Sequence, residues 1–154
     1  MKLRRAVESD LAALMGWFPD AHSTGVWSTP NFRFPFTKET FRKDAHWDEL
    51  DSYCLVADDG DLLAFGQFYE HFNRVHLARL IVNPNRRGQG CGTELVRRLM
   101  EAGHRKLGHD EYSLYVYGWN TPAVACYRSV GFIEHAPPKD DPKSLDDCMF
   151  MVRK

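Results

Sequence analysis

Residues 81–93 carry the most structural information in this chain, and they read Ile81-Val82-Asn83-Pro84-Asn85-Arg86-Arg87-Gly88-Gln89-Gly90-Cys91-Gly92-Thr93. An apolar run predicts a strand that ends at Val82, and an amphipathic helical pattern follows the glycines. Alternating glycines let a backbone approach a ligand closely, and N–H groups at a helix start point at negative charge. The stretch therefore predicts a strand, a phosphate-binding loop and a helix.

Two common phosphate-binding loops do not fit this spacing. A P-loop carries Lys-Ser or Lys-Thr after its last glycine, whereas Thr93-Glu94 follows Gly92 here. A dinucleotide-binding loop has the pattern Gly-x-Gly-x-x-Gly, whereas Gly88, Gly90 and Gly92 alternate. The spacing therefore disfavours a P-loop or dinucleotide-binding domain. A glycine-rich turn that binds no ligand stays open as an alternative.

Length and composition predict one domain that spans residues 1–154. The hydrophobic fraction of 44% is ordinary for a globular protein, and a net charge of -1 gives no basic surface for nucleic acid. No apolar run approaches the ~20 residues of a membrane helix, and Glu8, Ser9 and Asp10 interrupt any signal-peptide pattern. Four cysteines without metal-site spacing predict free thiols, a cytoplasmic location and no bound metal.

Hydrophobic periodicity and turn residues predict the order of the elements. Strands are expected at about 3–6, 52–57, 62–69, 75–82, 111–117, 132–135 and 148–152. Helices are expected at about 9–18, 37–50, 93–107 and 123–130, and residues 19–36 are expected to be irregular. Hairpins followed by a strand–helix–strand crossover predict an α/β (α+β) fold with a mixed, mostly antiparallel central sheet flanked by helices.

A second motif follows the glycine loop after one helix and one strand. It reads Asn120-x-x-Ala123-x-x-x-Tyr127-x-x-x-Gly131-Phe132. Together with Arg87-x-x-Gly90-x-Gly92, it resembles the Gcn5-related N-acetyltransferase (GNAT) superfamily. The resemblance implies a sheet that splays open between the strands ending near Val82 and Tyr117, with acetyl-CoA in the opening. It also implies an enzyme that transfers the acetyl group to a primary amine by direct attack.

The resemblance further implies which residues hold acetyl-CoA. Backbone groups of Leu80, Ile81 and Val82 are expected to bind the pantetheine arm, as an added strand would. Asn120 is expected either to hydrogen-bond the pantetheine or to cap the following turn. The pyrophosphate is expected to meet the backbone of Arg87, Gly88, Gln89, Gly90, Cys91, Gly92 and Thr93.

Two catalytic roles also come from the resemblance. Tyr127 is expected to protonate the departing thiolate, because a phenol with a pKa of ~10 keeps its proton at neutral pH. The alternative is a packed aromatic side chain whose hydroxyl bonds the backbone. The backbone N–H of Leu80 is expected to stabilise the oxyanion.

The general base stays open. Histone-type members of the superfamily carry a glutamate where this chain has His76, and ribosomal-protein-type members carry one where it has Tyr115. His76 is the candidate base because histidine has a reference pKa of ~6.5, although a structural histidine fits the position as well. Glu70, His71 and a chain of water molecules are the alternatives.

The acceptor is expected to be an amine of a small molecule or of a protein. The aromatic residues between Trp17 and Phe36 either wall the acceptor side or fill the core. A late acidic loop is a further candidate to attract a cationic amine, and it contains Asp140, Asp141, Asp146 and Asp147. A homodimer is one expected assembly, since dimers are common in the family, and neither nucleic acid nor membrane is an expected partner. The alternative function is a non-catalytic acyl-CoA-binding sensor, motivated by the two missing glutamates.

Overall fold

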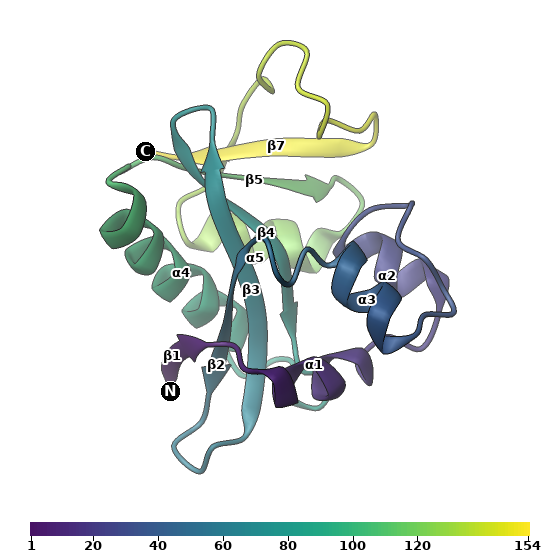
Figure 1. Ribbon diagram of the computed structural model, residues 1–154. Coiled ribbons are helices and arrows are strands. Elements are labelled where there is room, and N and C mark those ends of the chain that lie inside the picture. Colours follow the sequence, from purple (N-terminus) through teal and green to yellow (C-terminus); the bar gives the residue numbers. More distant parts are fainter.

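One open sheet organises the molecule, and the computed structural model describes all 154 residues (Figure 1). The strand order is β1-β2-β3-β4-β5-β7-β6. The strands are β1 (Lys2–Arg5), β2 (Asp51–Val56), β3 (Leu62–His71), β4 (Arg74–Val82), β5 (Tyr112–Tyr117), β6 (Ile133–Glu134) and β7 (Cys148–Arg153). All neighbours are antiparallel except β4 and β5, which are parallel, so the predicted mixed, mostly antiparallel sheet is confirmed.

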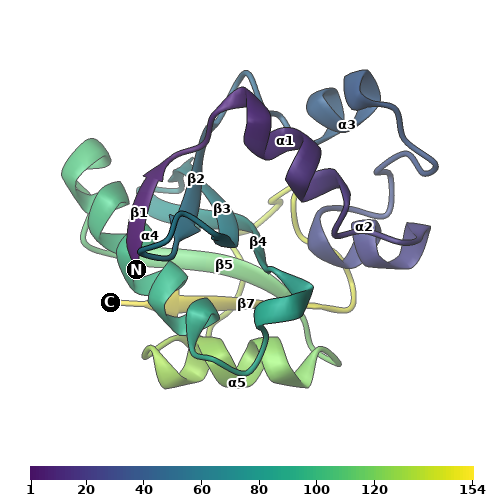
Figure 2. The same cartoon turned by 90° about the horizontal axis from the view of Figure 1, so that it is seen from below.

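Helices cover both faces of this sheet (Figures 1 and 2). They are α1 (Glu8–Met15), α2 (Ala21–Trp27), α3 (Lys38–Asp44), α4 (Cys91–Leu107) and α5 (Thr121–Ser129), with a short 3-10 turn at Pro84–Arg86. One hydrophobic cluster joins the sheet to α4 and α5, and a second joins it to α1, α2 and α3. No helix is long and apolar enough to cross a membrane.

Two glycines set how closely α4 lies on the sheet. A Cβ atom on Gly66 of β3 would stand 2.6 Å from the Cδ1 atom of Leu99. A Cβ atom on Gly103 of α4 would stand 2.4 Å from the Cγ1 atom of Val75. Both separations are far below van der Waals contact, so hydrogen at these positions lets the helix and the sheet meet.

The expectation of an irregular segment over residues 19–36 is wrong, because α2 occupies Ala21–Trp27. The Asp20 carboxylate accepts a hydrogen bond from the backbone N–H of Ser23 at 2.8 Å and so caps the helix. The hydroxyl of Ser23 reaches back to the backbone N–H of Asp20 at 3.4 Å. The sequence contains this reciprocal cap as Asp-x-x-Ser, but the nearby prolines and aromatic residues favoured the prediction of an irregular segment.

Other helix boundaries move for local reasons. The helix expected over residues 37–50 ends at Asp44, and His46 then adopts a positive φ of 51° that no α-helix contains. The first helix ends at Met15 rather than near Phe18. The long helix begins at Cys91 rather than Thr93, and α5 begins at Thr121 rather than Ala123.

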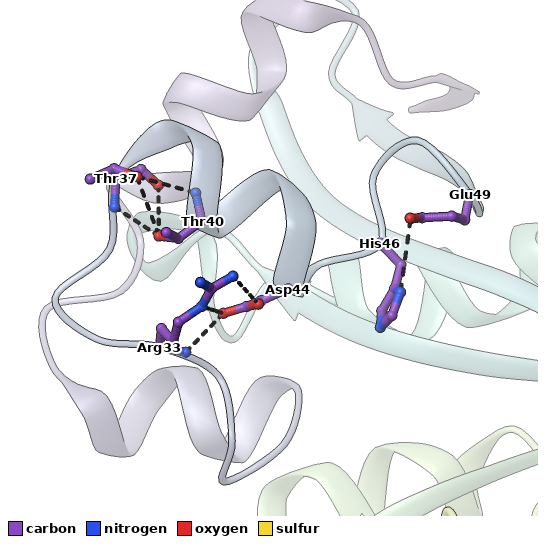
Figure 3. A network of polar contacts seen from close by, with 6 residues as sticks. All are labelled: Arg33, Thr37, Thr40, Asp44, His46 and Glu49. Carbon is purple, nitrogen blue, oxygen red and sulfur yellow. Dashed lines mark hydrogen bonds and ion pairs between the residues drawn. The ribbon is translucent and has the colours of Figure 1, made fainter.

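Polar contacts fix the segment that joins α2 to α3 (Figure 3). The Arg33 guanidinium donates to both carboxylate oxygens of Asp44, with N–O distances of 2.9 and 3.0 Å. At the start of α3, the Thr37 hydroxyl accepts from the Thr40 backbone N–H at 3.1 Å. These groups are exposed, so each contributes at most ~1 kcal/mol, yet together they hold the loop in one position.

Candidate active site

A cleft opens where β4 and β5 separate. The two strands pair only at Val75–Tyr112 and His76–Ser113, so β4 has no partner on that side from Leu77 to Val82. Figure 1 shows β5 and β7 crossing the direction of β3 and β4 steeply. The cleft has a volume of about 1190 Å³ and contacts α2, β4, the glycine loop, β5 and α5.

A bulge in β4 lies beside this opening. Gln67 of β3 pairs with Ala78 and Phe65 pairs with Ile81, which leaves Arg79 and Leu80 without ladder partners on β3. Arg79 takes a positive φ of 50° to accommodate the extra residue. The Leu80 backbone therefore has no ladder partner on either side and faces the cleft.

The glycine loop continues from the end of β4. Gly88 and Gly90 have φ values of 77° and 80°, and a Cβ on either would meet nothing within 4 Å. Glycine is thus required for the left-handed backbone rather than for space. Gly90 is the N-cap of the 17-residue α4 and supplies no side-chain cap, so the first N–H groups of that helix lack a capping partner.

Most predicted acetyl-CoA contacts line one cleft. They are Leu80, Ile81, Val82, Arg87, Gly88, Gly90, Cys91, Gly92, Thr93, Asn120 and Tyr127. Gln89 does not line it. The Asn120 side chain makes no capping hydrogen bond, which removes one of its two predicted roles and leaves its amide free at the cleft.

Tyr127 lies on α5, half-buried, with its ring centroid 6.3 Å from that of Phe132. Its hydroxyl has no hydrogen-bond partner within the protein although the residue lines the cleft. The alternative reading, a hydroxyl satisfied by backbone, therefore does not describe this side chain. Burial raises the pKa of the phenol, so the group stays protonated at neutral pH.

His76 lies at the inner end of the cleft and is only 3% exposed. Its Nδ1 atom is 2.8 Å from the Oγ atom of Ser113 on β5. Burial lowers the pKa of His76 to about 3, and the positive charges of nearby side chains add to the lowering. A histidine with this pKa is neutral near pH 7 and is a poor proton acceptor, which argues against His76 as general base.

Glu70 and His71, the other side-chain candidates for the general base, do not line the cleft. His71 is bound through Nε2 to Oδ2 of Asp141 at 2.8 Å, and the Tyr115 hydroxyl donates to the same oxygen at 2.6 Å. Glu70 accepts a hydrogen bond from the Asn73 backbone at 3.1 Å, in the turn after β3. No three His, Cys, Asp or Glu side chains gather as metal ligands.

The aspartates of the late loop do not line the cleft. The Asp141 side chain is fully buried, and its carboxylate accepts from Tyr115, from the Lys143 backbone and, in one tautomer, from His71. The other aspartates of this loop do not line the cleft either. The aspartates of this loop therefore offer no direct contact to an amine in the cleft.

The cleft extends beyond the predicted acetyl-CoA contacts. Side chains of α2, including His22, Val26 and Trp27, line it together with Arg79 and Lys143. Trp17 and Trp27 pack in or against the core on that face and also line the cleft. Phe32 and Phe36 pack in or against the same core but do not line the cleft. The capping pattern that starts at Asp20 predicts α2, but no local sequence pattern predicts that Arg79 lies in a bulge.

Comparisons with known proteins agree on one family. The model of the acetyltransferase (GNAT) family matches residues 21–132. A thialysine N-epsilon-acetyltransferase of Mus musculus is 26% identical over 144 residues, covering 84% of this chain and 82% of the relative. A mycothiol acetyltransferase of Clavibacter sepedonicus is 34% identical over 91 residues, which are 58% of this chain and 30% of that protein.

Solved structures share the fold. A spermidine N-acetyltransferase from Vibrio cholerae, in complex with CoA and spermine, has a TM-score of 0.73 at 18% identity, covering 98% of this chain and 93% of that one. The ribosomal-protein-S18-alanine N-acetyltransferase from Escherichia coli has a TM-score of 0.69 at 23% identity, with 99% and 92% covered. The family match spans most of the chain, including β4, the glycine loop and the Tyr127 motif, and the chain therefore belongs to the acetyltransferase (GNAT) family.

Proposed function

We propose that this chain transfers the acetyl group of acetyl-CoA directly to the primary amine of a small molecule. The observation that carries the proposal is the unpaired edge of β4 from Leu77 to Val82, which faces the cleft and leads into the glycine loop. The relatives named for thialysine and spermidine support a small-molecule acceptor.

The residues present fit acetyl-CoA at both ends. Unpaired N–H and C=O groups of Leu80 to Val82 offer hydrogen bonds to the amides of a pantetheine arm. The uncapped N-terminus of α4 after Gly90 offers N–H groups and a positive dipole end to a pyrophosphate. Arg87 adds a positive side chain beside that end of the cleft.

Acetyl-CoA supplies a thioester whose carbonyl carbon accepts the amine. The backbone N–H of Leu80, which has no ladder partner at the bulge, donates to the negative charge that develops on the carbonyl oxygen. Tyr127 gives its phenolic proton to the sulfur as the carbon–sulfur bond breaks. Its oxygen then takes a proton from the attacking nitrogen, which becomes acidic once the new bond has formed.

The acceptor ammonium must first lose one proton to become a nucleophile. We assign this proton to water in the cleft rather than to His76, because the buried imidazole has a pKa of about 3. His76 then serves to hold Ser113 at the point where β4 and β5 part. A cytoplasmic location and a homodimeric assembly remain part of the proposal.

A panel of amines with acetyl-CoA, followed by release of free thiol, tests the proposal. Thialysine, spermidine and an alanine amino-terminal peptide are chosen from the names of relatives and structural neighbours, and lysine is added as the natural analogue of thialysine. We expect turnover with at least one small amine. Tight CoA binding without turnover across the panel would instead identify an acyl-CoA sensor.

A further inference from the structure

The charged side chains that line the cleft are all cationic. They are Arg79, Arg86, Arg87 and Lys143, and no aspartate or glutamate is among the lining residues. Arg86 and Arg87 belong to the glycine loop, and Arg86 pairs with Asp61. Arg79 and Lys143 therefore give the remaining, acceptor side of the cleft its charge.

Arg79 is held rigidly by neutral partners. Its Nε atom donates to the Ser28 hydroxyl at 2.9 Å, and its Nη1 atom donates to Oε1 of Gln67 at 3.0 Å. Gln67 is itself fully buried and bound to the Ala45 carbonyl at 2.8 Å. These bonds leave Nη2 without a protein acceptor, and no carboxylate forms an ion pair with the guanidinium.

Lys143 supplies a second positive charge to the same side. Its ammonium lies 4.9 Å from the centre of the Tyr69 ring and makes no ion pair. Asp141 lies nearby, but its carboxylate is fully buried and already bonded to Tyr115 and His71. Arg79 and Lys143 therefore line the cleft without a carboxylate that neutralises them.

Such an arrangement is unfavourable without an anion. Burial lowers the pKa of the Arg79 guanidinium, which shows that the charge is poorly solvated. A partly buried charge that no opposite charge compensates is costly, and an incoming anion relieves the cost. A polycation would be repelled at the same place.

We propose that the acceptor amine carries a carboxylate, which Arg79 binds while Lys143 attracts it at the rim of the cleft. The inference rests on the proposed function and narrows its acceptor to amino acids and related amino carboxylates. Arg79 directly precedes Leu80, so a carboxylate bound there keeps the amine of the same molecule close to the thioester. The free Nη2 edge of a guanidinium suits a carboxylate oxygen.

Matched acceptors with and without the carboxylate test the inference. Lysine is compared with cadaverine, ornithine with putrescine, and β-alanine with ethylamine, while O-phosphoethanolamine reports preference for a phosphate. We expect kcat/KM to favour the carboxylate member of at least one pair by roughly ten- to hundredfold, as one charge-assisted contact gives. In R79Q the ratio of kcat/KM between the two members of that pair should fall toward one, while affinity for CoA is retained.

Two further variants keep the result interpretable. R97Q removes one positive charge from the exposed face of α4, outside the cleft, and should leave the preference unchanged. K143Q should lower the preference by a smaller factor than R79Q, and it serves if R79Q fails to fold. Equal or better use of the diamines, a preference only for the phosphate, or an unchanged preference in R79Q would each overturn the inference.

Calorimetry separates this failure from failure of the proposed function. Lysine and cadaverine are titrated into protein saturated with CoA, which needs no turnover. Absence of acetylation with any amine would sink the proposed function. Tighter binding of lysine than of cadaverine would still support a carboxylate site, whereas equal binding would refute it.

Discussion

Removing the Tyr127 hydroxyl isolates the chemical step from binding and folding. The hydroxyl has no hydrogen-bond partner in the protein, so Tyr127→Phe leaves no polar group unsatisfied. The ring remains to pack against Phe132 and the core that joins α5 to the sheet. We therefore expect the free energy of unfolding to change by less than ~0.5 kcal/mol.

The rate should respond much more strongly. A positioned proton donor contributes roughly 10²- to 10⁴-fold, which corresponds to about 2.7–5.4 kcal/mol of transition-state stabilisation. Single-turnover acetyl transfer, started by mixing the acetyl-CoA complex with amine, measures this step directly. Affinity for acetyl-CoA should stay within about twofold, because the backbone of β4 and the glycine loop provides the binding contacts.

Tyr53→Phe is the matched control, since Tyr53 stacks on Phe68 at 5.2 Å and does not line the cleft. It should leave single-turnover chemistry unchanged. Unchanged chemistry in Tyr127→Phe would refute the role of Tyr127 as proton donor. A parallel loss of acetyl-CoA affinity would show that the hydroxyl binds the cofactor rather than donating a proton.

Three further predictions concern pH, the loop and the core. His76 has a folded-state pKa of about 3 and an ordinary value of 6.5, so unfolding takes up a proton within this window and stability falls as pH drops through it. In urea unfolding between pH 6.5 and 4.5, His76→Gln should remove up to ~1.4 kcal/mol per pH unit of that loss of stability. The variant should keep the acidic limb of the kcat/KM profile. If the stability of the variant depends on pH as steeply as that of the wild type, His76 is not buried in its neutral form. Gly90→Ala should destabilise the fold by ~1–2 kcal/mol, because the backbone there is left-handed, and it should weaken CoA binding in calorimetry. Gly60→Ala is the control: Gly60 has a φ of 89° in the β2–β3 turn, so the substitution should cost a similar amount of stability and leave CoA affinity unchanged. Gly66→Ala should destabilise the fold by ~1–3 kcal/mol in thermal or urea unfolding, because the new methyl would lie 2.6 Å from Leu99, and wild-type stability would show that α4 can move away.

The parts of the site that depend on local backbone geometry were readable from the sequence. A strand ending at Val82, glycines at positions of positive φ and a helix beginning at once are properties of neighbouring residues. The spacing of Asn120 and Tyr127 reflects one helix, α5. The alternation of apolar and polar residues, together with the turn residues, likewise predicted a mixed, mostly antiparallel sheet. The sequence also contains the capping residues of α2, although this helix was not predicted.

Tertiary structure alone decided how the chemistry is distributed in the cleft. The pKa of His76 depends on burial and on contact with Ser113, which comes from a strand far along the chain. The position of the Arg79 side chain depends on the bulge in β4 and on hydrogen bonds to Ser28 and Gln67, which are distant in sequence. The desolvation and ion pairing of charged side chains in the cleft depend on residues that are distant in sequence. Local sequence patterns therefore predict where acetyl-CoA binds, whereas tertiary packing sets which charges face the acceptor.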